Sequence, residues 1–236
     1  MPAFDYRRRM GPAPSGAVWT PASLGVSLLA VLDIPGARTA GQMWQDAGKT
    51  SVASADEHDL AAIADAFVPA SDWTNQDATF FPKLDDVSGV WAARTTNGSL
   101  TRAVEAVTPV TVVMRFKANS QGVYVIAFGT AGNVMAVGFD NSDRLFSYTA
   151  TGYASAGDLN DLGWHTVSAV IGGAGARLRY DGAQIATGTN AAASPASIRI
   201  GSNDSSDSPC LMHRFILASG DIGDTEIAEA EAWVAL

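Results

Sequence analysis

The amino-acid sequence predicts an all-β fold, an antiparallel β-sandwich or jelly roll. From residue 110 onward, short runs of β-branched and aromatic residues recur about every ten residues. Gly, Asn and Asp separate these runs, and Asp181-Gly182 lies between two of them, which is a strong hairpin signal. Regular short strands joined by such turns are typical of β-sandwiches.

The first element in chain order is an extended arm, residues 1–20, and residues 21–236 form the predicted sandwich domain. The arm is rich in Pro and Gly and has no hydrophobic periodicity, so it cannot hold itself folded. Aromatic side chains beside a run of arginines can become ordered on binding, so we expect the arm to dock onto another protein. The candidate docking residues are Phe4, Tyr6, Arg7, Arg8 and Arg9. A terminus without a role is the alternative.

An apolar segment, Leu24–Leu32, follows the arm and reads as a strand. Further on, the run from Ser54 to Glu57 has the spelling of a capping box, and apolar residues follow it at helical spacing as far as Phe67. This pattern predicts one short helix over Asp56–Asp65. An extended or looped segment is the alternative there, for a reason given below.

The strands of the sandwich are predicted to follow Pro69. Their ranges are Val110–Phe116, Val123–Phe128, Val134–Phe139, Arg144–Tyr148, Trp164–Ile171, Arg177–Tyr180, Gln184–Thr187, Ser197–Ile200 and Met212–Leu217. The glycine-rich connection Gly172–Gly175 joins two of them as a hairpin and not as a phosphate-binding loop. After the last strand, Asp224–Trp233 has acidic residues at its start and apolar residues at helical spacing, which predicts a short C-terminal helix or an extended tail.

Composition and charge exclude several classes of function. The net charge is −9, from 15 Lys and Arg against 24 Asp and Glu, which argues against nucleic acid and anionic membranes as partners. The longest apolar run is far shorter than a membrane span, so no membrane insertion and no signal peptide are expected. The single cysteine, Cys210, rules out an intrachain disulfide and fits a reducing site of synthesis.

The segment from Trp164 to the C-terminus resembles the laminin G-like and concanavalin A-like lectin/glucanase superfamily. The motifs that carry the resemblance are the Trp-led run Trp164–Val170, the hairpin run Arg177–Gly182, the strand end Ile198–Gly201 and the closing runs Phe215–Leu217 and Asp224–Ile227. The order of these motifs is the order usual in that family. The resemblance implies a concanavalin A-like jelly roll with a lectin-like role.

A second resemblance covers the upstream part. The run Met43–Thr50 and the short run Gly98–Leu100 look like a segment found ahead of such domains in phage and prophage structural proteins. In those relatives the region that corresponds to Asp56–Asp65 is extended or looped. The resemblance implies a spike, fibre or other surface component of a phage or of a phage-like gene transfer agent, with other particle proteins as partners and a homo-oligomeric state.

Catalytic groups are not evident in the sequence. Glycosidases of this fold carry closely spaced carboxylates on one strand, and no predicted strand here has them. Glu226, Glu229 and Glu231 lie together in the terminal segment, where they read as a solvated face. The histidines His58, His165 and His213 lack metal-ligand spacing and read as ordinary residues. The sequence therefore predicts a protein that is not an enzyme and needs no cofactor.

Two loops are dense in the oxygen ligands that calcium prefers. Their candidate ligands are Asp140, Asp143, Asn203, Asp204 and Asp207. The resemblance to laminin G-like domains, which often bind calcium at one rim, keeps this site open. Plain turn chemistry is the preferred interpretation, because Asn, Asp and Ser dominate turns anyway.

Sugar binding needs aromatic faces that are open to solvent. Trp73, Trp91 and Tyr153 lie beside polar or small residues and are the candidates for stacking on a pyranose ring. The other tryptophans considered read as core residues by their neighbours; they are Trp44, Trp164 and Trp233. The resulting hypothesis is a non-enzymatic lectin-like spike component that binds host capsular or surface polysaccharide. A purely structural spike-base or adaptor protein is the alternative.

Overall fold

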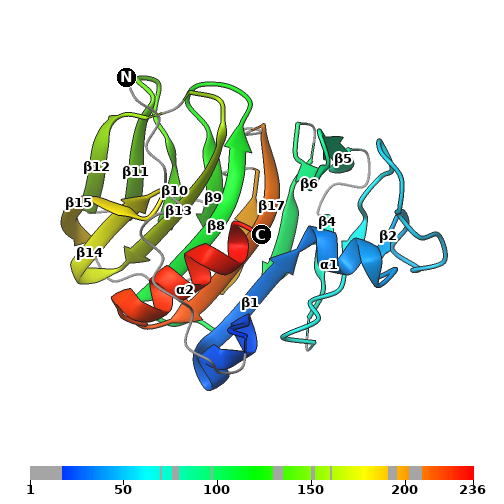
Figure 1. Cartoon of the computed structure of the whole chain (residues 1–236), viewed down its shortest axis with the longest axis horizontal. Helices are drawn as coiled ribbons and strands as arrows, with labels where there is room; N and C mark the ends of the chain where they lie inside the picture. The colour runs from blue at the N-terminus through cyan, green and yellow to red at the C-terminus, as the bar shows by residue number, and fades with distance from the viewer. Residues whose placement is uncertain are drawn as a thin grey trace.

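Two antiparallel sheets face each other across one hydrophobic core in the computed structural model of this chain (Figure 1). The structure describes residues 18–69, 71–75, 80–96, 98–129, 135–149, 152–159, 161–190, 196–201 and 209–236. This arrangement confirms the predicted all-β antiparallel sandwich. The arm residues Phe4, Tyr6, Arg7, Arg8 and Arg9 lie outside the described residues.

The first sheet, sheet A, holds the strands on which the site described below is built. In spatial order its strands are β15 (Ala183–Asn190), β14 (Gly173–Tyr180), β13 (Trp164–Ile171), β8 (Val110–Ala118), β17 (Cys210–Ser219), β6 (Val90–Arg94) and β5 (Lys83–Val87). The N-terminal strand β1 (Leu28–Asp33) also pairs with β17. Strands β15, β14 and β13 are consecutive in sequence, as are β6 and β5, and between these two groups lie β8 and β17, which come from distant parts of the chain. Such long connections are typical of a jelly roll.

The second sheet, sheet B, completes the sandwich. Its order is β12 (Gly152–Asp158), β11 (Arg144–Thr149), β10 (Met135–Phe139), β9 (Tyr124–Phe128), β16 (Ser197–Ile200), β7 (Leu100–Ala103), β4 (Trp73–Asn75), β3 (Ala62–Ile63) and β2 (Met43–Trp44). The three short strands β4, β3 and β2 extend this sheet beyond β7, and Figure 1 shows β4 and β2 at the right of the molecule.

The core forms because side chains alternate between the two faces of each strand. On β8, Val112, Met114 and Phe116 point into the space between the sheets and are fully buried. The facing strands supply their partners, among them Phe139 at 5.9 Å from Phe116 between ring centroids. Burial of one such large apolar side chain stabilises the fold by about 1.5–3 kcal/mol. The apolar face of each strand therefore turns to the core, and the opposite face is the one that can bind a ligand.

The predicted strands are confirmed from residue 110 onward, with the hairpin glycines in place. The backbone is left-handed at Gly172, Gly173, Asp181 and Gly182, which lie at the two turns joining β13, β14 and β15. Strands β5, β6, β7 and β12 carried no prediction. Their sequences are short, charged or rich in small residues, and β5 reads Lys-Leu-Asp-Asp-Val, so little hydrophobic alternation is present.

The helix predicted over Asp56–Asp65 is wrong, and the extended alternative is correct. The backbone of this segment pairs with β5, since Glu57 donates its N–H to the Leu84 carbonyl at 2.8 Å and Leu84 donates to the His58 carbonyl at 2.8 Å. Leu60 and Ile63 are both fully buried in the sandwich core. The apolar residues of this segment are spaced as in a helix, but they are buried by an extended backbone that pairs with β5. Tertiary contacts here override the local helix propensity.

The segment Leu24–Leu32 is a strand only in its second half. A 3-10 helix, η2 (Pro21–Ser27), precedes β1, and Gly25 has a φ of 57° inside it. A short helix, α1 (Ile34–Thr39), follows β1; the Asp33 side chain accepts the Gly36 N–H at its start. Proline at residue 35 fits the first turn of this helix, because its missing N–H has no partner there in any helix.

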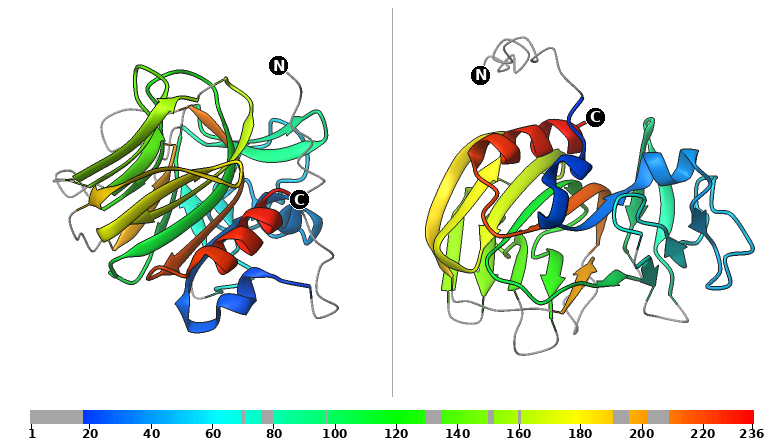
Figure 2. Two further views of the ribbon diagram at one scale, coloured as in Figure 1. Left: turned by 60° about the vertical axis from the view of Figure 1, so that its left-hand side comes forward. Right: turned by 90° about the horizontal axis from the view of Figure 1, so that it is seen from below.

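The predicted C-terminal helix is confirmed as α2 (Asp224–Val234), which lies across the outer face of sheet A (Figures 1 and 2). Ala230, Trp233 and Val234 pack against Val113 of β8 and Ile216 of β17. Glu231 is 5% exposed and accepts hydrogen bonds from Ser168 and Arg179, so its assignment to a solvated face is wrong, whereas Glu226 and Glu229 are exposed. No helix in the described ranges has the length and apolar character of a bilayer span.

A buried ion pair fastens the N-terminal segment to sheet B. Asp65 and Arg102 pair at 2% and 3% exposure. The same carboxylate accepts backbone N–H groups of Val31 at 2.6 Å, Phe67 at 2.9 Å and Val68 at 2.8 Å. Strand β1 of sheet A and β7 of sheet B are thus tied through one side chain.

Candidate functional site

One row of side chains crosses the outer face of sheet A. The strand registers place Trp164 opposite Lys117, Lys117 opposite Leu211, Leu211 opposite Arg94, and Arg94 opposite Lys83. Their strand neighbours Phe116, Met212, Ala93 and Leu84 belong to the core. Because side chains alternate along a strand, the row faces away from the core, on the same face that α2 partly covers.

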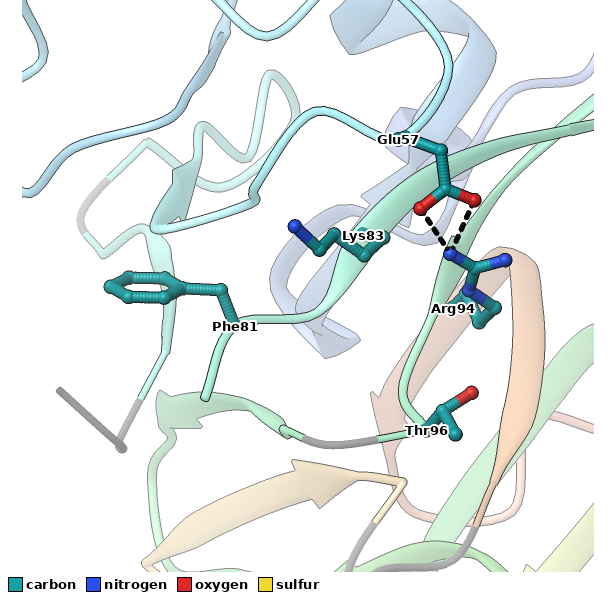
Figure 3. A pocket seen from close by; sticks show the side chains of 5 residues that line it. All are labelled: Glu57, Phe81, Lys83, Arg94 and Thr96. Atoms are coloured by element: carbon teal, nitrogen blue, oxygen red, sulfur yellow. Dashed lines mark hydrogen bonds and ion pairs between the residues drawn. The ribbon is translucent and has the colours of Figure 1, made fainter. Parts of the chain in front are cut away.

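The row ends in a pocket at the β5–β6 hairpin (Figure 3). The pocket has a volume of about 340 Å³ and is lined by Glu57, Phe81, Lys83, Arg94 and Thr96. Lys83 and Arg94 come from adjacent strands, Glu57 from the extended segment beside β5, and Phe81 and Thr96 from the chain flanking the hairpin. Five positions from three chain segments converge on one cavity.

Backbone pairing holds the wall that carries Glu57. Residues Asp59 and Lys83 form an antiparallel bridge, which adds the extended segment to the edge of sheet A. Glu57 itself has a φ of 63°, a conformation that is uncommon outside glycine, and the two backbone bonds to β5 hold it there. The segment thereby presents the Glu57 carboxylate to the guanidinium of Arg94.

The opposite wall depends on Gly98. A Cβ at this position would lie 2.7 Å from the Phe80 carbonyl oxygen and 2.9 Å from the backbone nitrogen of Pro82. Only glycine allows the two backbones to approach so closely. This contact fixes the chain on both sides of Phe81 and so fixes the aromatic ring that lines the pocket.

Ion pairs neutralise most of the charge in the pocket. One nitrogen of Arg94 lies 2.6 Å from both carboxylate oxygens of Glu57, and a second lies 3.1 Å from Asp85. Lys83 pairs with Asp59. The hydrogen bond that Arg94 donates to Glu57 raises the pKa of Arg94. Burial raises the pKa of Asp85; the charge of Arg94 lowers it, and the neighbouring carboxylates raise it further.

This arrangement offers planar hydrogen-bonding groups beside an aromatic ring. A guanidinium held by two carboxylates keeps N–H and oxygen atoms in fixed directions, which suits recognition of paired hydroxyl groups. Phe81 supplies an apolar surface, and Thr96 is an exposed hydroxyl that can donate or accept. Concave sites with an apolar wall and a few oriented polar groups are typical of small-ligand and sugar-unit binding.

The predicted stacking residues are not gathered at this pocket. Trp73 is 0% exposed and donates its Nε1–H to the Val31 carbonyl at 2.7 Å, so its prediction as a stacking residue is wrong. Trp91 is half-buried against the core, and the Arg38 guanidinium lies 3.8 Å from its ring centroid, which leaves that face closed to a sugar. Tyr153 pairs with Tyr148 in the β11–β12 ladder of sheet B, away from the pocket.

The other tryptophans also differ in part from expectation. Trp233 is 9% exposed and packs under α2, which confirms it as a core residue. Trp164 and Trp44 are only half-buried, so reading them as core residues is wrong. Trp164 lies on the outer row because the register of β13 pairs it with Lys117, an outward residue of β8. The residues next to Trp164 in the sequence do not reveal this register.

The first predicted calcium loop is built as a turn. Asp140 accepts the Ser142 N–H at 2.8 Å and pairs with Arg144 at 2.6 Å, so its carboxylate serves the turn and an arginine. Asp143 is 9% exposed and accepts from Gln121. In the part of the chain that is described, no group of three or more acidic, His or Cys side chains has metal-binding geometry. The second loop, with Asn203, Asp204 and Asp207, lies outside the described residues.

The histidines have partners that the sequence pattern does not reveal. His165 lies between two carboxylates, with Nε2 at 2.7 Å from Asp161 and Nδ1 at 2.9 Å from Asp181. Burial lowers the pKa of His165, but the hydrogen bonds and charges of the two aspartates outweigh it, so the pKa is raised. His213 lies 2.7 Å from the Trp91 carbonyl through Nδ1, and burial lowers its pKa.

The pocket residues carried no prediction. Glu57 lay inside the expected helix, and Lys83 and Arg94 lay on strands without hydrophobic alternation. The sequence signal available was the presence of both charge signs close together, in residues 83–86 and at Arg94. That pattern is also typical of a solvent-exposed hairpin. Their convergence depends on the bridge between Asp59 and Lys83, and no local pattern encodes such a contact.

Solved structures with the same architecture are similar to this chain at low sequence identity. Domain 4 of AbnA, a GH43 extracellular arabinanase from Geobacillus stearothermophilus in complex with arabinotriose, matches with a TM-score of 0.56 and 12% identity over 70% of this chain and 90% of that domain. Trypanosoma rangeli sialidase with 2,3-difluorosialic acid matches with a TM-score of 0.59 and 13% identity. The binding domain of botulinum neurotoxin serotype C1 matches with a TM-score of 0.59 and 9% identity.

These similarities show the fold of the chain, a two-sheet antiparallel sandwich of the concanavalin A-like type, and confirm that part of the predicted resemblance. The match covers 94% of this chain but 35% of the sialidase, and 89% of this chain but 53% of the toxin binding domain. The chain therefore spans about a third to a half of those two proteins. No protein-family model and no curated protein matches the sequence.

Proposed function

We propose that this protein is a non-enzymatic, glycan-binding surface component of a phage-like particle, with the pocket at the β5–β6 hairpin as its sugar site. The observation that carries the proposal is the pocket itself, in which an aromatic ring and a hydroxyl lie beside ion-paired planar groups. Structures of the same fold include a domain bound to arabinotriose and a sialidase bound to a sialic acid derivative. The proposed ligand is a capsular or other surface polysaccharide of the host cell to which the particle attaches.

Ion pairing of the carboxylates supports a binding role over hydrolysis. A glycosidase needs one carboxyl group that gives a proton and a second that attacks or activates water. Both oxygens of Glu57 lie at Arg94, and the Asp59 carboxylate lies at Lys83. Carboxylates held in this way keep their orientation, which suits the acceptance of hydroxyl hydrogen bonds.

Docking to the particle is assigned to the arm, residues 1–20, whose aromatic and arginine residues suit a protein partner. Synthesis in the bacterial cytoplasm, homo-oligomerisation and display on the particle surface belong to the same proposal, and the resemblance of residues 43–50 and 98–100 to phage structural proteins supports it. Deletion of residues 1–16 is expected to abolish incorporation into particles and to leave the sandwich folded. Loss of folding would contradict this role.

The glycan-binding proposal is tested with labelled protein on encapsulated host cells and on cells that lack the capsule. The wild type is expected to bind only encapsulated cells, and the variants Phe81→Ala and Glu57→Ala are expected to bind at least tenfold less. Glu229→Ala is the matched control, because Glu229 is an exposed carboxylate on α2, away from the pocket. Equal binding by wild type and pocket variants would contradict the assignment of the site.

Absence of binding to either cell type, with the protein folded and its oligomeric state measured, would favour the alternative of a structural spike-base or adaptor protein. In that case the arm would carry the function, and substitutions in the pocket would leave particle assembly unchanged.

A further inference from the structure

We propose that the sugar site is extended and takes a negatively charged glycan, one that bears carboxylate or sulfate groups, along the row from the pocket to Lys117 and Trp164. This inference rests on the glycan-binding function proposed above and names its class of ligand. The argument has three steps: the geometry of the row, the charge along it, and the part of the face that α2 leaves uncovered.

The row is straight and continuous. Lys83, Arg94, Leu211, Lys117 and Trp164 lie directly opposite one another on five neighbouring strands. Neighbouring strands lie about 4.8 Å apart, so the row extends about 19 Å from the pocket to the indole. This length exceeds a single sugar ring several-fold. The residue in the middle of the row, Leu211, is 4% exposed, so a polymer laid across the strands would contact mainly the residues toward the two ends of the row.

Charge changes along the row. At the pocket end, Arg94 and Lys83 are both paired with carboxylates. At the far end Lys117 is half-buried on the outer face, and it forms no ion pair among the residues that the structure describes. Among the described residues, therefore, no carboxylate neutralises the Lys117 ammonium group, which can meet an anion on the outer face.

The adjacent row adds further positive charge. Arg115, two residues before Lys117 on β8, lies opposite Arg214 of β17. Arg115 donates to the Ala235 carbonyl, whereas Arg214 pairs with Asp33 and donates to the Trp233 carbonyl. Burial and the charge of Arg214 lower the pKa of Arg115. Arg115, Lys117 and Arg214 thus lie in this part of the face, with Asp33 paired to Arg214 and with Asp181, whose charge acts on Arg115.

Trp164 gives this cationic region an aromatic surface. The indole is half-buried, and the Arg115 guanidinium carbon lies 5.8 Å from its ring centroid. The edge contact with the His213 ring, at 6.1 Å between centroids and 70° between planes, fixes its orientation. An indole beside cations can hold the apolar face of a sugar ring while a lysine meets its acidic substituent.

The helix α2 leaves this part of the face open. On β8 the outward residues are Val113, Arg115 and Lys117 in order. Val113 packs under α2, Arg115 donates to the carbonyl of Ala235, the residue that follows α2, and Lys117 is the next outward residue along β8. Figure 1 shows α2 across the lower part of β13, β8 and β17. A second copy that docked through this same face would bring its positive charges against one another, so the face favours an acidic glycan as the occupant.

The experiment compares polymers that share a backbone and differ in charge. Binding of the full chain is measured by titration calorimetry to dextran sulfate against dextran, and to polygalacturonate against its methyl ester. The wild type is expected to bind at least one acidic polymer at least tenfold more tightly than its neutral counterpart, and the binding is expected to weaken as salt is raised.

Variants assign that binding to the row. Lys117→Gln is expected to weaken binding of the acidic polymer about fivefold, the usual scale for one partly exposed ionic contact, and to reduce its salt dependence. Lys49→Gln is the matched control, because Lys49 is a partly exposed lysine paired with Asp72 on the N-terminal segment. It is expected to bind as the wild type does.

Three results would overturn the inference. Equal affinity for charged and neutral polymers, or failure to bind either acidic polymer, would exclude an anionic ligand. If neutral glycans or encapsulated cells still bind through the pocket, the proposed glycan-binding function stands and only the acidic ligand class is wrong. Unchanged binding by Lys117→Gln would place the anion elsewhere. A change of oligomeric state in Lys117→Gln, measured by sedimentation, with glycan binding unaffected, would assign this face to a second copy of the chain.

Discussion

Removal of one charge from the buried Asp65–Arg102 pair is expected to destabilise the fold severely. The substitution Asp65→Asn keeps the size of the side chain and one acceptor oxygen but leaves Arg102 charged at 3% exposure. Burial raises the pKa of Asp65 and lowers that of Arg102, so each charge is desolvated and depends on its partner. A buried charge that loses its partner typically costs about 3–5 kcal/mol of unfolding free energy.

The magnitude is checked by urea unfolding followed by tryptophan fluorescence. Trp73 is a suitable reporter, because it is fully buried and the Arg102 guanidinium carbon lies 5.9 Å from its ring centroid. We expect Asp65→Asn and Arg102→Met each to lower the unfolding free energy by about 3–5 kcal/mol. The double variant should lose much less than the sum, since no uncompensated charge then stays buried.

The control for this prediction is an ion pair at the surface. Lys49 and Asp72 have side chains that are 42% and 26% exposed, and Lys49→Gln is expected to cost less than about 1 kcal/mol. A loss below about 1 kcal/mol for Asp65→Asn, or a double variant whose loss equals the sum of the singles, would refute the reasoning.

Three further predictions concern pH dependence, packing and thiol reactivity. The pKa of His165 is higher in the folded protein than the value of about 6.5 in the unfolded chain. Protonated His165 therefore stabilises the fold fully below a pH of about 6.5, and this stabilisation is lost as the pH rises through the folded pKa. The difference in urea midpoint between wild type and His165→Asn should therefore be larger at pH 5 than at pH 9, and the opposite trend would contradict it. Gly138→Ala should unfold at a lower temperature, since its Cβ would lie 2.1 Å from the Val123 carbonyl oxygen; an unchanged melting temperature would show that the strand adjusts. Cys210 is 0% exposed and burial raises the pKa of its thiol to about 11, so it should react with a thiol reagent only after unfolding, and rapid labelling of the native protein would exclude that burial.

Sequence and structure agree where each segment encodes its own conformation. Val110–Phe116 became a strand because its alternate apolar side chains have a core face to fill, and Asp181-Gly182 became a turn because both residues take a positive φ. Ile227 and Ala230 at helical spacing became the buried side of α2. These elements depend on contacts within a few residues or on a regular hydrophobic period, and either can be read from the letters alone.

The disagreements share one cause. The expected helix over Asp56–Asp65 gave way to an extended segment because its backbone bonds go to β5, which lies about 25 residues along the chain. Trp73 and Glu231 have polar neighbours in sequence yet are buried by β1 and by β13 and β14, respectively. Burial depends on which distant segments arrive at a position, and a local pattern contains no record of that.

The sequence by itself determined the all-β class, the positions of the main strands and turns, the terminal helix and the acid excess of the chain. Only the tertiary structure decided which aromatic residues stay open and which charges meet. Glu57, Lys83 and Arg94 form one pocket because an added edge segment and a hairpin lie side by side, and Lys117 has no carboxylate partner among the residues that the structure describes. Strand pairing between residues far apart in the chain sets these neighbours, so the function-bearing face could be located only after the sheets were assembled.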